Sequence, residues 1–219
     1  MFHVEHNVCD HHISLLLKEG AQFVDCTLSD EQLSLFTNYF LLLWEWNKKI
    51  NLTGLKSPEE IVACLFIDSI VPYRIFVEDQ VDSILDIGSG AGFPGLALKI
   101  MLPHLPLTLL EPHLKKAAFL DYLIGTLGFQ FVTVIPKRIE QLAKESPFLS
   151  VTAVTFKAIS PFSILPLTAS FLKDGGKCYL WRAKPLSEHQ HLGAFRLEQE
   201  IQYALPFGYG MRTLSILRL

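Results

Sequence analysis

The fold of this chain is decided by residues 83–95, which read SILDIGSGAGFPG. Apolar, strand-forming residues run into three alternating glycines, Gly88, Gly90 and Gly92, before an amphipathic segment begins. This pattern predicts a strand, a loop and a helix, with the loop at the carboxyl edge of a sheet, where α/β folds bind small molecules. Because one turn does not require three alternating glycines, they indicate that the backbone approaches a ligand closely there.

Beyond this loop, short apolar strands alternate with amphipathic helices. We expect strands at 83–86, 107–111, 131–135, 151–156 and 177–181, and helices at about 95–102, 114–127, 138–145 and 162–173. This alternation predicts parallel pairing in a doubly wound, Rossmann-like α/β sheet. The last segment, with a turn at 206–210 between 200–205 and 211–219, predicts an antiparallel hairpin at the sheet edge.

The first third of the chain is typical of helices. Ser29, followed three residues later by Gln32, forms a capping pattern ahead of a helix at about 33–49. Ser57 and Pro58 begin a second helix, which extends to about residue 71. We therefore expect a helical N-terminal extension at 1–73, packed on a Rossmann-like domain at 74–219.

Composition excludes several classes of protein. The chain has 219 residues, of which 50% are hydrophobic, and a formal charge of -3. A disordered tail would be far less apolar, and a chain of this length can form one sizeable core. Charged residues and prolines interrupt the long apolar runs, so we expect no membrane span, and no secretory signal is visible, so we expect a cytoplasmic protein.

Cysteines and histidines form no metal-binding pattern. The four cysteines are far apart in the sequence, without a CxxC pair, which predicts free thiols in a reducing compartment. The histidines at 3, 6, 11, 12, 189 and 191 lack the carboxylate and strand context of a metal site. We therefore expect no metal.

Two cofactors compete for the glycine loop. Residues 90–95 spell GxGxxG, the dinucleotide fingerprint of nicotinamide-dependent oxidoreductases. However, Asp86 lies two residues before the first glycine and completes D-x-G-x-G-x-G, the loop of S-adenosylmethionine-dependent methyltransferases. Glu111, at the end of the second strand, can accept both ribose hydroxyls in either case. The pattern favours the methyltransferase, with the oxidoreductase as an alternative.

From about residue 30 to its end, the chain resembles one family closely. The bacterial ribosomal small-subunit methyltransferase G family, also called glucose-inhibited division protein B, shares the order and spacing of five segments, namely 46–53 (WNKKINLT), 68–69 (DS), 86–95 (DIGSGAGFPG), 109–111 (LLE) and 115–116 (KK). The resemblance implies methyl transfer from S-adenosylmethionine to N7 of one guanosine in 16S rRNA, in free form or within the small ribosomal subunit. It also implies a Rossmann-like domain behind a short helical extension.

The resemblance also implies which residues contact the cofactor. Carried over by position, the contacts are Gly88, Phe93, Ile139, Glu140 and Lys157, and the loop pattern adds Gly90, Gly92 and Glu111. The chain departs from the family in three places: Lys157 replaces an arginine, Cys64 and Leu65 replace a basic residue and a histidine, and Arg182 replaces a lysine. Lysine cannot reproduce the planar guanidinium of arginine.

No catalytic acid or base is expected, because guanine N7 has an exposed lone pair and no proton to remove. Correct orientation can then supply much of the rate enhancement. Contacts to RNA are expected from basic residues near the crevice: Lys48, Lys49, Lys115, Lys116, Arg138, Arg182 and Arg212. We expect a monomer. A second alternative, suggested by the departures, is a non-catalytic RNA-binding or ribosome-assembly factor on a methyltransferase scaffold.

Overall fold

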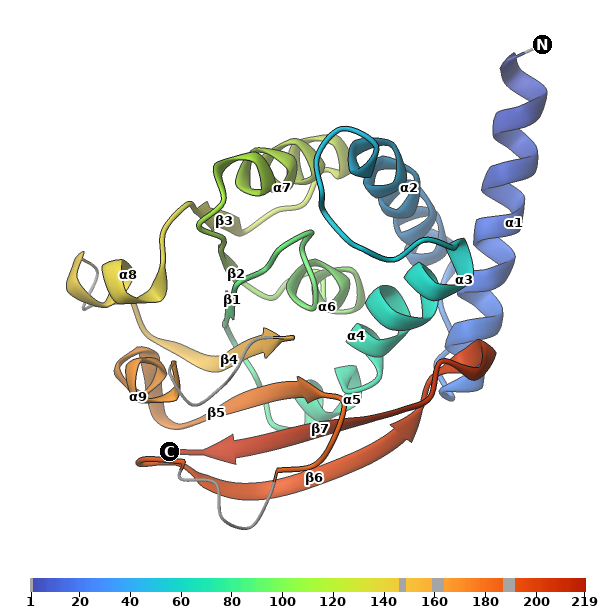
Figure 1. The fold of residues 1–219 in the computed structure, drawn as a ribbon. Coiled ribbons are helices and arrows are strands. Elements are labelled where there is room, and N and C mark those ends of the chain that lie inside the picture. Colours follow the sequence, from blue (N-terminus) through green and yellow to red (C-terminus); the bar gives the residue numbers. More distant parts are fainter. Residues whose placement is uncertain (1, 146–148, 159–163, 187–191) are drawn as a thin grey trace.

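The computed structural model describes residues 2–145, 149–158, 164–186 and 192–219, with backbone alone for 2–9. Its centre is a seven-stranded sheet in the order β3-β2-β1-β4-β5-β7-β6 (Figure 1). The strands are β1 (Ile84–Ile87), β2 (Leu107–Leu110), β3 (Val132–Ile135), β4 (Val151–Lys157), β5 (Leu172–Arg182), β6 (Arg196–Ala204) and β7 (Met211–Arg218). The first five are parallel, and β7 pairs antiparallel with both β5 and β6. The strand order reverses between β1 and β4, so the topological switch point lies at the carboxyl ends of these two strands.

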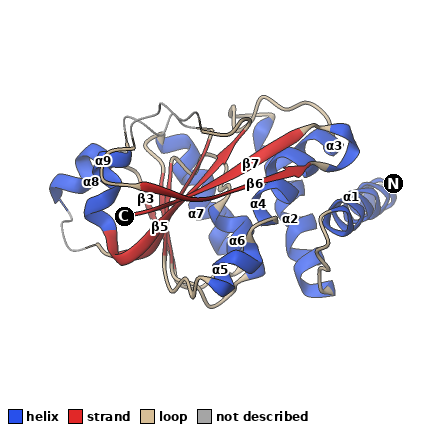
Figure 2. Cartoon of the chain, turned by 90° about the horizontal axis from the view of Figure 1, so that it is seen from below, coloured by secondary structure: helices blue, strands red, loops and turns tan. Residues whose placement is uncertain are grey.

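Alternate residues along the central strands enter two different cores. Ile84, Leu109 and Tyr179 belong to the larger one, whereas Leu85 and Leu110 belong to the smaller one. Helices α6 (Gly95–Met101) and α7 (Leu114–Leu127) cover the first face, and α8 (Ile139–Glu145) and α9 (Leu165–Thr168) cover the second. Figure 2 shows the strands between these two layers. This period of two is the pattern of a sheet buried on both faces.

The N-terminal helices share the larger core with the sheet. They are α1 (Phe2–Phe23), α2 (Asp30–Asn47), α3 (Pro58–Ile61), a π-helical segment (Val62–Ile67), α4 (Asp68–Ile70) and α5 (Tyr73–Glu78). Ser29 and Gln32 form the expected capping box of α2, and Ser57 caps α3. Core residues on both sides of residue 73 belong to one cluster. The division of the chain expected there stays a prediction.

The sequence predicted most elements, but it gave no bounds for α1 or α5. The helix expected at 162–173 is wrong in its last part: α9 is short, a 3-10 turn at Ala169–Phe171 follows, and Leu172 begins β5. Pairing of Leu172 with Val151 of β4 extends the strand backward through Gly175 and Gly176. Residues 162 and 163 lie outside the described residues. Among the described helices, none is long and apolar enough to cross a membrane.

Candidate functional site

The glycine loop lies at the switch point, where β1 ends. The amides of Gly88 and Ser89 donate to the Leu110 carbonyl oxygen of β2, at 2.7 and 3.2 Å. Gly88, Gly90 and Gly92 have φ of 69°, 58° and 101°, in the left-handed region that favours glycine. The alternating glycines therefore let the chain turn sharply while it stays bonded to the neighbouring strand.

The glycines serve different purposes. A methyl group on Gly90 would meet only the Gly88 carbonyl oxygen, at 3.8 Å, so this position faces open space. A methyl on Gly92 would lie 2.4 Å from the Tyr39 hydroxyl oxygen and 2.7 Å from a Leu96 methyl. Close packing inside the protein thus requires glycine at 92, whereas Gly90 is free to face a ligand.

Asp86, on β1, supports the glycine loop through buried hydrogen bonds. It is fully buried, and its carboxylate accepts hydrogen bonds from the Gly95 amide at 3.2 Å and the Thr155 hydroxyl at 2.8 Å. Burial raises the pKa of this carboxyl to about 6, although these hydrogen bonds oppose the shift. Asp86 therefore holds the start of α6 and β4 against β1, and its role in the loop is structural.

Glu111, one residue beyond β2, reaches the middle of the loop. The residue is 3% exposed; its Oε2 accepts from the Gly90 amide at 2.8 Å, and its Oε1 accepts from the His113 amide at 2.8 Å. Each carboxylate oxygen can accept more than one hydrogen bond. The carboxylate is thus held rigidly, with capacity left for two hydroxyl groups of a ligand.

A slot of about 130 Å³ opens beside Gly88. It brings Gly88 together with Ile139 and Glu140, which follow β3 and begin α8. The other lining residues are Ile87, Leu110, Pro112, Lys137, Arg138 and Ile164. Its lining combines apolar side chains with the polar groups of residues 137, 138 and 140, which suits a flat ring with polar edges.

Phe93 belongs to the larger core, whereas apolar residues of the slot such as Ile87 and Ile139 belong to the smaller one. Its ring stacks on Tyr39 of α2, with centroids 5.0 Å apart and an interplanar angle of 9°, and Phe66 meets it edge-on at 4.9 Å. The Phe93 side chain therefore packs against the N-terminal helices, and its backbone amide donates to the Ser89 carbonyl at 3.0 Å. Its expected contact with a cofactor stays a prediction.

Lys157 ends β4 and is held by three oxygens. Its ammonium lies 2.7 Å from Asp68 Oδ2, 2.6 Å from the Cys64 carbonyl oxygen and 3.3 Å from the Ser69 hydroxyl. Asp68 is 2% exposed and also accepts from the Tyr203 hydroxyl at 2.6 Å. No local pattern in the sequence predicts this contact between Asp68 and Lys157, although residues 68–69 are among the segments of the resemblance.

Comparison with known proteins now assigns the family. The sequence model described as rRNA small subunit methyltransferase G matches residues 32–210. The chain belongs to this family. Membership decides between the two cofactors left open by the glycine pattern, in favour of S-adenosylmethionine and methyl transfer.

Curated relatives agree with this assignment, and solved structures agree with the fold. The ribosomal RNA small subunit methyltransferase G of Lactococcus lactis subsp. cremoris is 38% identical over 195 residues, which cover 84% of this chain and 82% of the relative. The protein of the same name from Caldanaerobacter subterraneus is 33% identical over 93% of this chain and 88% of its own. A putative O-methyltransferase from Klebsiella pneumoniae superposes with a TM-score of 0.58 over 83% of this chain and 90% of that one, at 14% identity. TrmN from Thermus thermophilus gives 0.53 over 68% and 48%, at 15% identity, so both confirm the Rossmann-like methyltransferase fold alone.

Beside the family's glycine loop lies a basic groove of about 660 Å³. It is lined by Lys49, Ile50 and Asn51 after α2, and by Pro112, His113, Leu114, Lys115 and Lys116 at the start of α7. Because Pro112 and His113 follow Glu111 directly, the groove adjoins the rigid carboxylate. No acidic residue lies among these lining residues, so the groove suits an anionic ligand.

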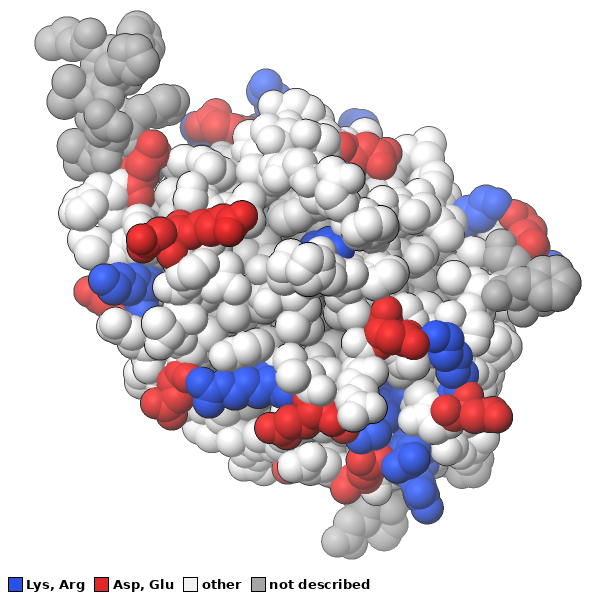
Figure 3. Space-filling view, turned by 180° about the vertical axis from the view of Figure 1, so that it is seen from behind, with Lys and Arg blue, Asp and Glu red and all other residues white. Residues whose placement is uncertain are grey.

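The other predicted RNA contacts are scattered. Lys48 is exposed and pairs with Glu45 at 2.6 Å, Arg138 lines the slot, and Arg182 donates to the Lys184 carbonyl oxygen at 3.1 Å. The Arg212 guanidinium lies 3.8 Å from the Cys64 sulfur. Figure 3 shows positive and negative side chains intermixed on the face that is turned away from the viewer in Figure 1. Within the described residues, no cluster of His, Cys, Asp and Glu is placed to hold a metal.

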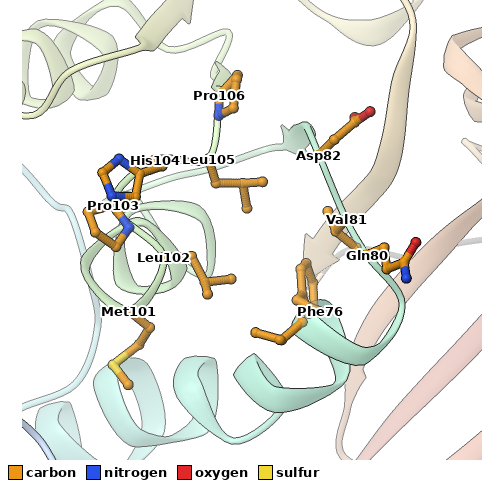
Figure 4. Close-up of a pocket in the computed structure, with 11 residues that line it drawn as sticks. Phe76, Gln80, Val81, Asp82, Met101, Leu102, Pro103, His104, Leu105 and Pro106 are labelled. Atoms are coloured by element: carbon orange, nitrogen blue, oxygen red, sulfur yellow. The ribbon is translucent and has the colours of Figure 1, made fainter.

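A separate hollow of about 460 Å³ lies at the opposite, amino edge of the sheet (Figure 4). Its lining includes His104 and the apolar side chains of Phe76, Met101, Leu102 and Leu105, which Figure 4 labels. The segments that line it precede β1 and β2, whereas the glycine loop and Glu111 follow these strands. It is therefore distinct from the candidate cofactor site.

Proposed function

We propose that this enzyme transfers a methyl group from S-adenosylmethionine to N7 of a specific guanosine in 16S rRNA. The observation that carries the proposal is the Glu111 carboxylate, bonded to the Gly90 amide beside a position with open space, in a chain of this family. Because the substrate is ribosomal, the proposal includes action in the cytoplasm, and we expect the enzyme to act as a monomer.

The residues present fit the cofactor. Gly88 and Gly90 would bring bare backbone against its amino-acid part, and the fixed oxygens of Glu111 would accept the ribose hydroxyls. Ile139 and Glu140 line the slot beside Gly88, which would hold the adenine. In this arrangement Phe93, Gly92 and Lys157 would act indirectly, because their packing and ion-pair contacts set the shape of the loop and of the end of β4.

The reaction makes modest chemical demands on the protein. S-adenosylmethionine supplies an electrophilic methyl group on a sulfonium, and guanine N7 supplies a lone pair without a proton to be removed. The enzyme must therefore hold N7 in line with the methyl group, and orientation of this kind can contribute about 7 to 11 kcal/mol. No side chain needs to act as a general base.

The basic groove supports RNA as the substrate. Lys49, Lys115 and Lys116 stand where an RNA backbone could pass beside Glu111, and phosphate contacts would fix the register of the strand. The chain has a formal charge of -3, so a local groove rather than overall charge would attract the RNA. Arg138 at the rim of the slot would contribute to the same surface.

The test uses methyl-labelled S-adenosylmethionine with free 16S rRNA and with small ribosomal subunits, both lacking the modification. We expect label at a single guanosine, mapped by cleavage selective for 7-methylguanosine, in at least one substrate form. Glu111→Ala should abolish transfer, and Glu140→Ala should raise KM for the cofactor. Label on another base would show that guanine N7 is not the methyl acceptor. Cofactor binding without any methyl transfer would favour the alternative of a non-catalytic ribosome-assembly factor.

A further inference from the structure

The loop that would hold the cofactor is fixed from two opposite directions. From the sheet, Glu111 accepts a hydrogen bond from the Gly90 amide at 2.8 Å. From the N-terminal helices, the Tyr39 hydroxyl donates to the carbonyl oxygen of Ala91, the next residue, at 2.6 Å. Two adjacent backbone groups are thus bound by side chains from separate layers of the fold.

Tyr39 is built into this position. It is fully buried on α2, stacks on Phe93 within the loop and meets Phe66 of the π-helical segment edge-on at 5.1 Å. Its hydroxyl oxygen occupies the space that a methyl group on Gly92 would need. Burial raises the pKa of this hydroxyl well above its usual value, so it stays a hydrogen-bond donor at neutral pH.

We propose that Tyr39 is a positioning residue for S-adenosylmethionine binding: its hydroxyl sets the path of the backbone at Gly90 and Ala91, so α2 is part of the cofactor site. The inference rests on the proposed function, because it concerns the same site. A hydrogen bond to a carbonyl in a loop without regular secondary structure has no neighbouring ladder to replace it. Loss of the hydroxyl therefore leaves the Ala91 carbonyl without its partner in a buried setting.

The direct test is Tyr39→Phe, which keeps the ring and its stacking on Phe93 and removes only the hydroxyl. Tyr179→Phe is a matched control, because Tyr179 is also buried, packs against the Phe76 ring with centroids 4.3 Å apart and donates to Asp79 Oδ2 at 2.6 Å, away from the loop. Calorimetry with S-adenosylmethionine should give a Kd about three- to tenfold weaker for Tyr39→Phe and unchanged for Tyr179→Phe. KM for rRNA should be unchanged in both.

Hydrogen exchange without cofactor provides a second, independent measurement. Amides of 88–93 should exchange faster in Tyr39→Phe and at the normal rate in Tyr179→Phe, since only the former releases the loop. If Tyr39→Phe binds the cofactor and exchanges its loop amides like the unaltered chain, the inference about Tyr39 is overturned, while the proposed function stands. Equal losses of cofactor affinity in Tyr39→Phe and Tyr179→Phe would overturn it in the same way. No binding of S-adenosylmethionine by the unaltered chain would overturn the proposed function and this inference with it.

Discussion

Gly90 offers a sharp test of the site, because its backbone is strained for other residues but its surroundings are open. With φ of 58°, Gly90→Ala should cost about 1 to 2 kcal/mol in the free energy of unfolding. The added methyl meets only one protein atom, the Gly88 carbonyl oxygen at 3.8 Å, so no packing penalty adds to this. It would instead project into the space that we assign to S-adenosylmethionine.

Gly128 provides the matched control. It ends α7 with φ of 71°, and a methyl group there meets nothing within 4 Å. It follows the 14 residues of α7, about 20 Å along the helix from the end near Glu111. Gly128→Ala should therefore lose the same stability as Gly90→Ala while it leaves the cofactor site intact.

The two variants are compared by urea unfolding and by calorimetric titration with S-adenosylmethionine. Both variants should lose about 1 to 2 kcal/mol in the free energy of unfolding. Only Gly90→Ala should raise the Kd for the cofactor, by about tenfold or more, because the extra methyl group would overlap the bound ligand. Gly92→Ala should lose about 3 kcal/mol or more, because its methyl would lie 2.4 Å from the Tyr39 hydroxyl oxygen. Full affinity of Gly90→Ala for the cofactor would refute the assignment of this space.

Three further predictions concern charge. Burial raises the pKa of Asp86 from 3.8 to about 6, so the stability that this carboxyl contributes is present below pH 4 and falls by about 3 kcal/mol as pH rises to 7. The free energy of unfolding in urea should not show this fall in Asp86→Asn. The same dependence on pH in Asp86→Asn and the unaltered chain would contradict the prediction. Lys157→Met should cost about 3 kcal/mol in thermal or urea unfolding, because Asp68 stays buried without its cation, and Asp68→Asn in the same chain should restore part of it. Lys115→Ala should weaken rRNA binding and reduce the slope of log K against log salt by about 0.7, with cofactor affinity unchanged. Lys173→Ala, at the amino edge of the sheet, should bind rRNA as tightly as the unaltered chain. Equal salt slopes for Lys115→Ala and the unaltered chain in filter binding would argue against the groove.

Local patterns in the sequence predicted most of the fold. Ser29 with Gln32 and Ser57 with Pro58 mark helix starts that the structure confirms, because capping depends on residues three positions apart. The strands after residue 72 lie within a few residues of their expected positions, except β5, whose start depends on pairing with Val151. Such long-range pairing leaves no local signal, and it converts the end of an expected helix into strand.

Residues 83–95 by themselves determined the strand, the loop and the helix of the candidate site, since alternating glycines and apolar runs act on the nearest few residues. Only the tertiary structure decided which glycine faces open space, that Asp86 is a buried support, and that Tyr39 and Phe93 stack. The contact of Tyr39 with Ala91 joins residues 52 positions apart, and the pair of Lys157 with Asp68 joins two separate layers. Contacts of this kind form only when the layers pack, because burial and the directions of side chains belong to the assembled core rather than to any short segment.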